Sequence, residues 1–285
     1  MDNETIARVA VLGAGTMGNG IAQICAQAGC EVQLRDVDDA AIERGMTAIR
    51  ASLEKLVQKG KLADADRQSL LGRIHTTKQT AAAVENADLV VEAIPERMDL
   101  KLELFREVDR AAPAHALLGT NTSSLSVTEI GGSTKTPERV IGMHFFNPVP
   151  VMELCELVRG MRTSDETVAR ARAFATRIGK RAIVVNDVPG FATSRLGVAL
   201  GAEAIRMLES GVASAEDIDL AMELGYRHPM GPLKLTDLVG LDVRLAILEH
   251  LHREIGEQFR PPTLLRQMVR AGKLGRKSGE GFYKY

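Results

Sequence analysis

Residues 9–18 read VAVLGAGTMG, an apolar run that leads directly into three glycines with the spacing G-x-G-x-x-G. Apolar side chains then recur at helical spacing up to residue 28, and Gly29 ends that pattern. A buried strand, a glycine turn and a helix in this order are typical of the dinucleotide-binding end of a parallel sheet.

Each part of the glycine turn has a physical reason. Gly13 permits the tight turn, Gly15 lets a pyrophosphate approach the backbone, and Gly18 allows the helix to pack closely on the sheet. The free amides at the start of the helix, around Thr16 and Met17, bind phosphate. We therefore expect these five residues to bind a dinucleotide.

The acidic residue of this unit specifies which dinucleotide. Asp36 lies 18 positions after Gly18, at the end of the next apolar strand. Its carboxylate can accept hydrogen bonds from both ribose hydroxyls and would repel a 2′-phosphate, so the sequence predicts NAD rather than NADP. Strand alternation is expected to turn the neighbouring Arg35 to the other side.

Strand and helix signals alternate through the first two thirds of the chain. Further short apolar runs lie at residues 32–34, 89–91, 117–119, 140–143 and 183–185, most of them flanked by helical patterns. This alternation predicts an α/β fold, a Rossmann-type doubly wound and mostly parallel sheet with a helical hairpin inserted at about residues 38–73.

Strand signals stop after residue 187. Helices are expected at 191–208, from a capping serine at 214 to a glycine at 225, at 242–259 and at 263–271. We therefore predict two domains. Residues 1–187 would form the NAD-binding domain and residues 188–285 an all-α C-terminal domain.

Composition excludes several classes of protein. Among 285 residues, 45% are hydrophobic, and 36 basic residues against 37 acidic ones give a net charge of −1. That balance gives the chain no net positive charge of the kind that binds nucleic acid. No apolar run approaches the length of a membrane-spanning helix. Three cysteines without metal-ligand spacing argue against a zinc site and fit a reducing cytoplasm. We expect a cytoplasmic protein without a metal ion.

Polar residues follow two of the later apolar runs, where a parallel sheet gathers its ligands. Asn121 and Ser123 follow residues 117–119, and His144 follows residues 140–143. Glu156 lies, by alternation, on the apolar face of its strand, where a carboxylate needs a partner. His144 is the nearest candidate, and the pair would act as an oriented general base. A half-buried histidine and an edge-strand glutamate remain the alternative.

At this point the chain resembles a known family. The stretches that carry the resemblance are GAGTMGNGIAQ (13–23), VVEAIPE (90–96), NTSSL (121–125), HFFNPVPVM (144–152), VPGF (188–191), EDID (216–219), HPMGP (228–232), GLD (240–242) and GEGFY (279–283). They resemble the short-chain L-3-hydroxyacyl-CoA dehydrogenases, including 3-hydroxybutyryl-CoA dehydrogenase, over nearly the whole chain.

The resemblance implies a reversible NAD-dependent oxidation of the 3-hydroxyl of an acyl-CoA. His144 would take the hydroxyl proton and Glu156 would hold the imidazole, while Ser123 and Asn147 would hydrogen-bond near the reacting oxygen and the nicotinamide. It further implies cofactor contacts at Glu96, Lys101, Asn121 and Ser123, and CoA contacts at Ser52 and Lys59 on the hairpin. For Ser52 and Lys59 an exposed helix face is the alternative.

The resemblance also implies that the C-terminal domain closes over the site and forms a homodimer. One position departs from the family pattern, because Ser194 stands where the family usually has an asparagine near the acyl group. Two other functions therefore stay open. One is an NAD-dependent dehydrogenase of a hydroxy acid without CoA, of the L-gulonate or carnitine type, and the other is a non-catalytic NAD-binding protein.

Overall fold

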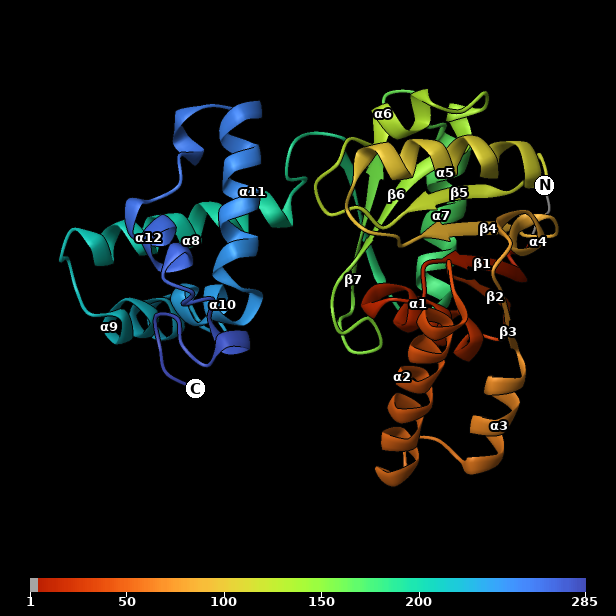
Figure 1. The fold of residues 1–285 in the computed structure, drawn as a ribbon, viewed down its shortest axis with the longest axis horizontal. Helices are drawn as coiled ribbons and strands as arrows, with labels where there is room; N and C mark the ends of the chain where they lie inside the picture. Colours follow the sequence, from red (N-terminus) through yellow and green to blue (C-terminus); the bar gives the residue numbers. More distant parts are fainter. Residues whose placement is uncertain (1–4) are drawn as a thin grey trace. The chain divides into compact units, whose positions relative to one another are not determined.

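The structure is a computed structural model that describes residues 5–285. The chain forms two compact units, one ending at Asp187 and the other beginning at Val188 (Figure 1). The first unit contains the sheet and the second is helical, so each has its own core.

The first unit is built on one eight-stranded sheet. The strand order is β3-β2-β1-β4-β5-β6-β7-β8, and every neighbouring pair is parallel except β6 and β7. The strands are β1 (Arg8–Leu12), β2 (Glu31–Arg35), β3 (Ile74–Thr77), β4 (Leu89–Glu92), β5 (Leu117–Thr120), β6 (Val140–Phe145), β7 (Leu154–Arg159) and β8 (Arg181–Asn186). The predicted α/β fold with a mostly parallel sheet is confirmed.

The burial of the central strands explains why polar and apolar residues do not alternate in their sequences. All residues of β4, β5 and β6 are buried, because helices cover both faces of a doubly wound sheet. The connecting helices are α1 (Thr16–Gln27), α4 (Thr80–Val84), α5 (Met98–Ala111), α6 (Val127–Gly132) and α7 (Asp165–Arg177), with a short 3-10 helix at Pro137–Arg139. His144 lies inside β6 rather than after it.

The predicted hairpin consists of α2 (Asp39–Gln58) and α3 (Asp64–Gly72), which stand side by side off the sheet (Figure 1). Asp38 caps α2 by accepting a hydrogen bond from the amide of Ala41 at 2.7 Å. Gly60, with φ +64°, ends it in a left-handed turn that only glycine adopts readily. Arg67 of α3 joins Glu54 of α2 at 2.5 Å, which ties the two helices together.

The second unit contains α8 (Thr193–Glu209), α9 (Ala215–Leu220), α10 (Pro232–Val239), α11 (Leu241–Glu254) and α12 (Thr263–Arg270). Shorter turns lie at Ala221–Gly225, Glu257–Phe259 and Arg276–Ser278. Ser214 caps α9 as expected, by accepting from the amide of Asp217. The helix expected over 242–259 ends early, because Gly256 adopts φ +131°. Helix α10 is not predicted by the sequence pattern, because it is short and is bounded by Pro232 and Gly240.

Two buried aspartates organise this helical unit. Asp219 accepts from the amides of Leu233 and Lys234 at 2.8 and 2.9 Å, which satisfies the start of α10. Asp237 accepts from the amides of Phe282 and Tyr283, both at 2.9 Å, and so fastens the C-terminal segment to α10. Both carboxylates therefore stabilise the backbone of the unit.

Replacing Asp237 with asparagine should destabilise the helical unit. The amide nitrogen would place a donor against backbone donors, so at least one buried hydrogen bond of a charged acceptor is lost, at a cost of about 1.5–3 kcal/mol in the free energy of unfolding. Urea unfolding measures this change, with Glu254→Gln, an exposed change at the end of α11, as the control. Equal unfolding midpoints for the two variants would contradict the anchoring role.

Candidate active site

The glycine turn borders a cleft of about 1000 Å³ in the first unit. Gly13, Gly15, Thr16, Met17 and Asp36 all line it. A methyl group on Gly13 would lie 2.5 Å from the carbonyl oxygen of Ala93, with φ at +108°, whereas one on Gly15 would meet nothing within 4 Å. The turn is thus tight at its first glycine and open at its second, which is the shape that a pyrophosphate requires.

Gly18 fits the same pattern. A methyl group there would lie 1.7 Å from the carbonyl oxygen of Gly13, so any side chain would force α1 away from the turn. The strand, the turn and the helix start are therefore packed as the sequence predicts for a dinucleotide, and the residues fit NAD at this place.

Asp36 is held in this cleft by the turn itself. One carboxylate oxygen accepts from the amide of Ala14 at 2.7 Å and the other from the amide of Val37 at 2.6 Å. Arg35, the last residue of β2, also borders the cleft, and its Nε donates to the carbonyl of Lys78 at 3.3 Å. That its side chain faces away from Asp36 stays a prediction.

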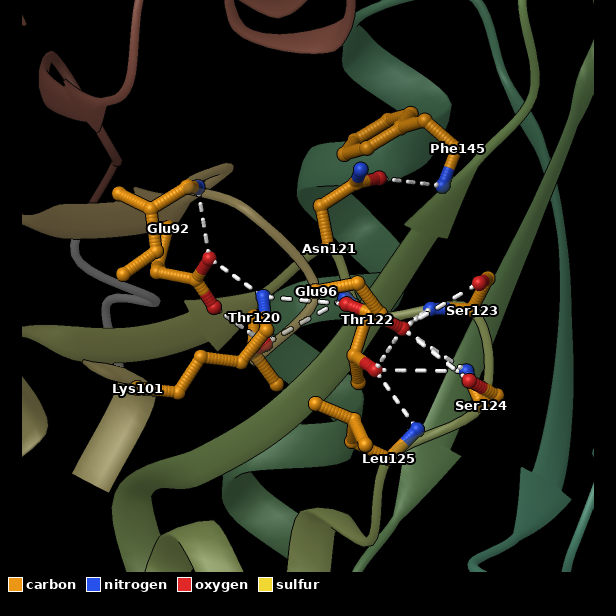
Figure 2. A network of polar contacts seen from close by, with 11 residues as sticks. Glu92, Glu96, Lys101, Thr120, Asn121, Thr122, Ser123, Ser124, Leu125 and Phe145 are labelled. Atoms are coloured by element: carbon orange, nitrogen blue, oxygen red, sulfur yellow. Dashed lines mark hydrogen bonds and ion pairs between the residues drawn. The ribbon is translucent and has the colours of Figure 1, made fainter. Parts of the chain in front are cut away.

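A buried ion pair lies at the carboxyl end of β4 (Figure 2). Glu92 accepts from the ammonium of Lys101 at 2.6 Å and from the hydroxyl of Thr120 on β5, also at 2.6 Å. Glu92 is 0% exposed and Lys101 is 1% exposed. Burial of either charge without the other would be energetically unfavourable. This pair joins the ends of β4 and β5 to α5.

The same lysine links to a second carboxylate, that of Glu96, at 3.3 Å (Figure 2). Glu96 accepts from the hydroxyl of Thr122 at 2.6 Å and from the amides of Ser123 and Ser124 at 2.8 and 3.2 Å. Burial alone would raise the pKa of Glu96, but the charge of Lys101 and these hydrogen bonds outweigh burial and hold the pKa below its ordinary value. Glu96 thus fixes the turn that carries Ser123.

His144 and Glu156 form the polar pair expected from strand alternation. They lie opposite each other on the antiparallel strands β6 and β7, and Nδ1 of the histidine is 2.7 Å from a carboxylate oxygen of the glutamate. His144 is 6% exposed and Glu156 is 0% exposed. The Phe146 ring lies 4.4 Å from the imidazole, centroid to centroid. The alternative of two unrelated side chains does not fit this geometry.

The loop after His144 is held by a buried lysine that the sequence analysis missed. Lys180 donates to the carbonyls of Val149 and Met152, at 2.5 and 2.7 Å, and thereby fixes the loop that begins at the exposed Asn147. Nothing near Lys180 in the sequence indicates this role, because its partners are backbone atoms about 30 residues away.

The remaining predicted residues lie in several places. Asn121 accepts from the amide of Phe145 at 2.9 Å, which ties the end of β5 to β6. Neither Lys101 nor Glu96 is among the residues that line the glycine cleft, and the ammonium of Lys101 faces the carboxylates of Glu92 and Glu96 instead. Ser52 is half-buried on α2 and Lys59 is exposed at its end, while Ser194 is half-buried in the first turn of α8.

Two further observations concern the whole of residues 5–285. Within that range, no three His, Cys, Asp or Glu side chains are grouped so that they could hold a metal ion. No helix in the same range is long and apolar enough to span a membrane.

Two family models match the chain. Residues 8–188 match the NAD-binding domain of 3-hydroxyacyl-CoA dehydrogenase, and residues 190–285 match its C-terminal domain. A probable 3-hydroxybutyryl-CoA dehydrogenase from Bacillus subtilis is 48% identical over 281 residues, covering 98% of each chain. One from Deinococcus radiodurans is 48% identical over 276 residues, covering 96% of this chain and 99% of that protein.

A solved structure agrees with these sequences. The crystal structure of (S)-3-hydroxybutyryl-CoA dehydrogenase PaaH1 from Ralstonia eutropha superimposes with a TM-score of 0.95 at 44% identity, over 99% of both chains. These matches confirm the predicted oxidoreductase class and the NAD cofactor. The chain therefore belongs to the 3-hydroxyacyl-CoA dehydrogenase family.

Proposed function

We propose that the protein interconverts an (S)-3-hydroxyacyl-CoA and a 3-ketoacyl-CoA with NAD, with a short acyl group such as 3-hydroxybutyryl as substrate. The observation that carries this proposal is the buried hydrogen bond between His144 and Glu156 beside the end of a dinucleotide-binding sheet. Relatives that are 48% identical over almost their whole length have 3-hydroxybutyryl-CoA in their names, which supports the acyl-CoA substrate.

His144 acts as the general base in the direction of oxidation. Because Nδ1 donates its hydrogen to the carboxylate of Glu156, Nε2 is the basic atom of the ring and takes the proton of the 3-hydroxyl. The imidazole becomes positively charged, and the buried carboxylate stabilises that charge. In the reverse direction the imidazolium returns the proton to the keto oxygen.

The glycine turn and its neighbours hold the cofactor. NAD supplies the acceptor for the hydride of C3 when it is bound. The amides at the start of α1 would hold the pyrophosphate, with room provided at Gly15, and Asp36 would accept hydrogen bonds from the adenosine ribose. Glu96 fixes the turn of Ser123 by accepting from its amide and, at 3.2 Å, from its hydroxyl. On substrate binding that hydroxyl and the amide of Asn147 would hydrogen-bond near the reacting oxygen.

The contacts with the rest of the substrate stay predictions. Ser52 and Lys59 would meet the phosphorylated end of CoA, and Ser194 the acyl group. The presence of both members of the catalytic pair argues against a non-catalytic NAD-binding protein. The names of the relatives favour an acyl-CoA over a hydroxy acid without CoA.

We further propose a cytoplasmic homodimer. All three cysteines are buried and free, which fits a reducing compartment. The second unit exposes large apolar side chains, among them Leu196 at 71%, Leu224 at 74% and Tyr226 at 75%. Such side chains are typical of surfaces that bind another protein, here a second copy of this chain.

Substitution of the base tests the reaction. His144→Ala should lower kcat about 10²–10⁴-fold, the usual contribution of a general acid–base, and should leave NADH binding nearly unchanged. Stopped-flow or steady-state reduction of acetoacetyl-CoA measures kcat, and His75→Ala, at an exposed histidine on β3, is the control. A variant that kept more than about a tenth of the wild-type kcat would require a different base.

Cofactor choice tests the role of Asp36. NADH should be preferred over NADPH by at least about tenfold in kcat/KM, because the carboxylate repels a 2′-phosphate. Asp36→Asn keeps an acceptor for the amide of Ala14 but removes the charge and the second acceptor, used by the amide of Val37, so it should lose most of that preference at a modest cost in stability. Equal use of both cofactors by the wild type would show that Arg35 cancels the effect of Asp36.

Light scattering tests the assembly. At micromolar concentration the protein should have about twice the 30.8 kDa mass of one chain. Leu196→Glu should weaken the dimer by placing a charge in the buried part of the interface. A wild-type mass equal to that of one chain at this concentration would contradict the proposed homodimer.

A further inference from the structure

Arg44 brings a positive charge to the cleft beside the glycine turn. The face of α2 that lines this cleft consists of Ala41, Arg44, Gly45 and Ala48. Because the other three residues are small, Arg44 is the one long side chain on this face, and there is room beside it. Within residues 5–285, no hydrogen bond or ion pair joins its guanidinium to another part of the protein.

The packing of α2 places Arg44 at the same end of the cleft as Asp36. A methyl group on Gly45 would lie 2.6 Å from the carbonyl oxygen of Ala14, so α2 contacts the glycine turn at this residue. The amide of Ala14 in turn donates to the carboxylate of Asp36 at 2.7 Å. Arg44 is the immediate neighbour of Gly45, and it therefore lines the part of the cleft where the adenosine ribose of NAD would lie.

The charges of Asp36 and Arg44 are close to each other but do not form an ion pair in the part of the chain that the structure describes. Both carboxylate oxygens of Asp36 accept from backbone amides, those of Ala14 and Val37. The carboxylate is thus fixed by the backbone, and the guanidinium keeps all its donors for another anion.

The other charged groups that line the cleft are held elsewhere. Arg35 donates through Nε to the carbonyl of Lys78 at 3.3 Å. Asp38 accepts from the amide of Ala41 at 2.7 Å and thereby caps α2. The remaining carboxylates belong to a different helix, α5: Glu103 and Glu107. Arg44 is therefore the cation of this cleft that is best able to bind a ligand.

We propose that Arg44 forms a binding site for the 2′-phosphate of NADPH, and that Asp36 alone keeps NADPH out of it. A phosphate monoester carries about −1.5 to −2 charges at pH 7, and a guanidinium can donate two parallel hydrogen bonds to it. Sites of this fold that accept NADP use an arginine close to the ribose. The proposal concerns the cofactor only and does not depend on which acyl-CoA is the substrate.

Cofactor binding without substrate tests this site, because NADH and NADPH differ only in the 2′-phosphate. The quantity measured is the ratio of the Kd for NADPH to the Kd for NADH, from the fluorescence of the reduced nicotinamide. Asp36→Asn should lower this ratio at least about tenfold relative to the wild type. Adding Arg44→Met to Asp36→Asn should raise the ratio again at least about tenfold, the loss expected for a charge-assisted hydrogen bond.

The matched control is Arg50→Met in the same Asp36→Asn background. Arg50 lies on the same helix but outside the cleft, exposed and paired with Glu43 at 2.6 Å, so its removal takes the same charge from α2 and should leave the ratio unchanged. Equal ratios in the Arg44 and Arg50 variants would overturn the proposal. An equal loss of NADH and NADPH binding in the Arg44 variant would also overturn it, since Arg44 would then contact a part that both cofactors share. A wild-type ratio in Asp36→Asn would show that Asp36 is not the barrier.

Discussion

The hydrogen bond between His144 and Glu156 depends on how two strands of the sheet are paired. A carboxylate that is 0% exposed needs a partner that can carry or share a charge, and a catalytic imidazole needs one fixed orientation. The antiparallel pairing of β6 and β7 meets both requirements, because it places the two residues directly opposite each other. The single reversal of direction in an otherwise parallel sheet is thus the feature that brings His144 and Glu156 together.

Buried charge also sets the geometry around that pair. Lys101 sits between the carboxylates of Glu92 and Glu96, and Glu96 in turn holds the backbone of the Ser123 turn. Lys180 fixes the loop of Asn147 through two carbonyls. Lys180 acts on the backbone directly and Lys101 acts on it through Glu96, so buried charge as well as packing holds these two segments in place.

The sequence allowed prediction of the parts that depend on local pattern. The glycine turn, Asp36 and the hairpin follow from spacing and caps, and the partner of His144 follows from strand alternation at Glu156. The sequence did not reveal that Lys101 turns toward Glu92, or that Lys180 binds distant carbonyls, because such contacts depend on which segments the fold brings together. Helix α10 was missed since its eight residues are too few for a clear periodicity.

The central claim is that His144 and Glu156 act as one unit, and a double-mutant cycle on kcat tests it most directly. The four proteins are the wild type, His144→Ala, Glu156→Gln and the double variant. Once the imidazole is gone the carboxylate has nothing to orient, so the double variant should have the same kcat as His144→Ala within about twofold. If the two losses multiplied, Glu156 would act independently of His144, and the account of the site given above would be contradicted.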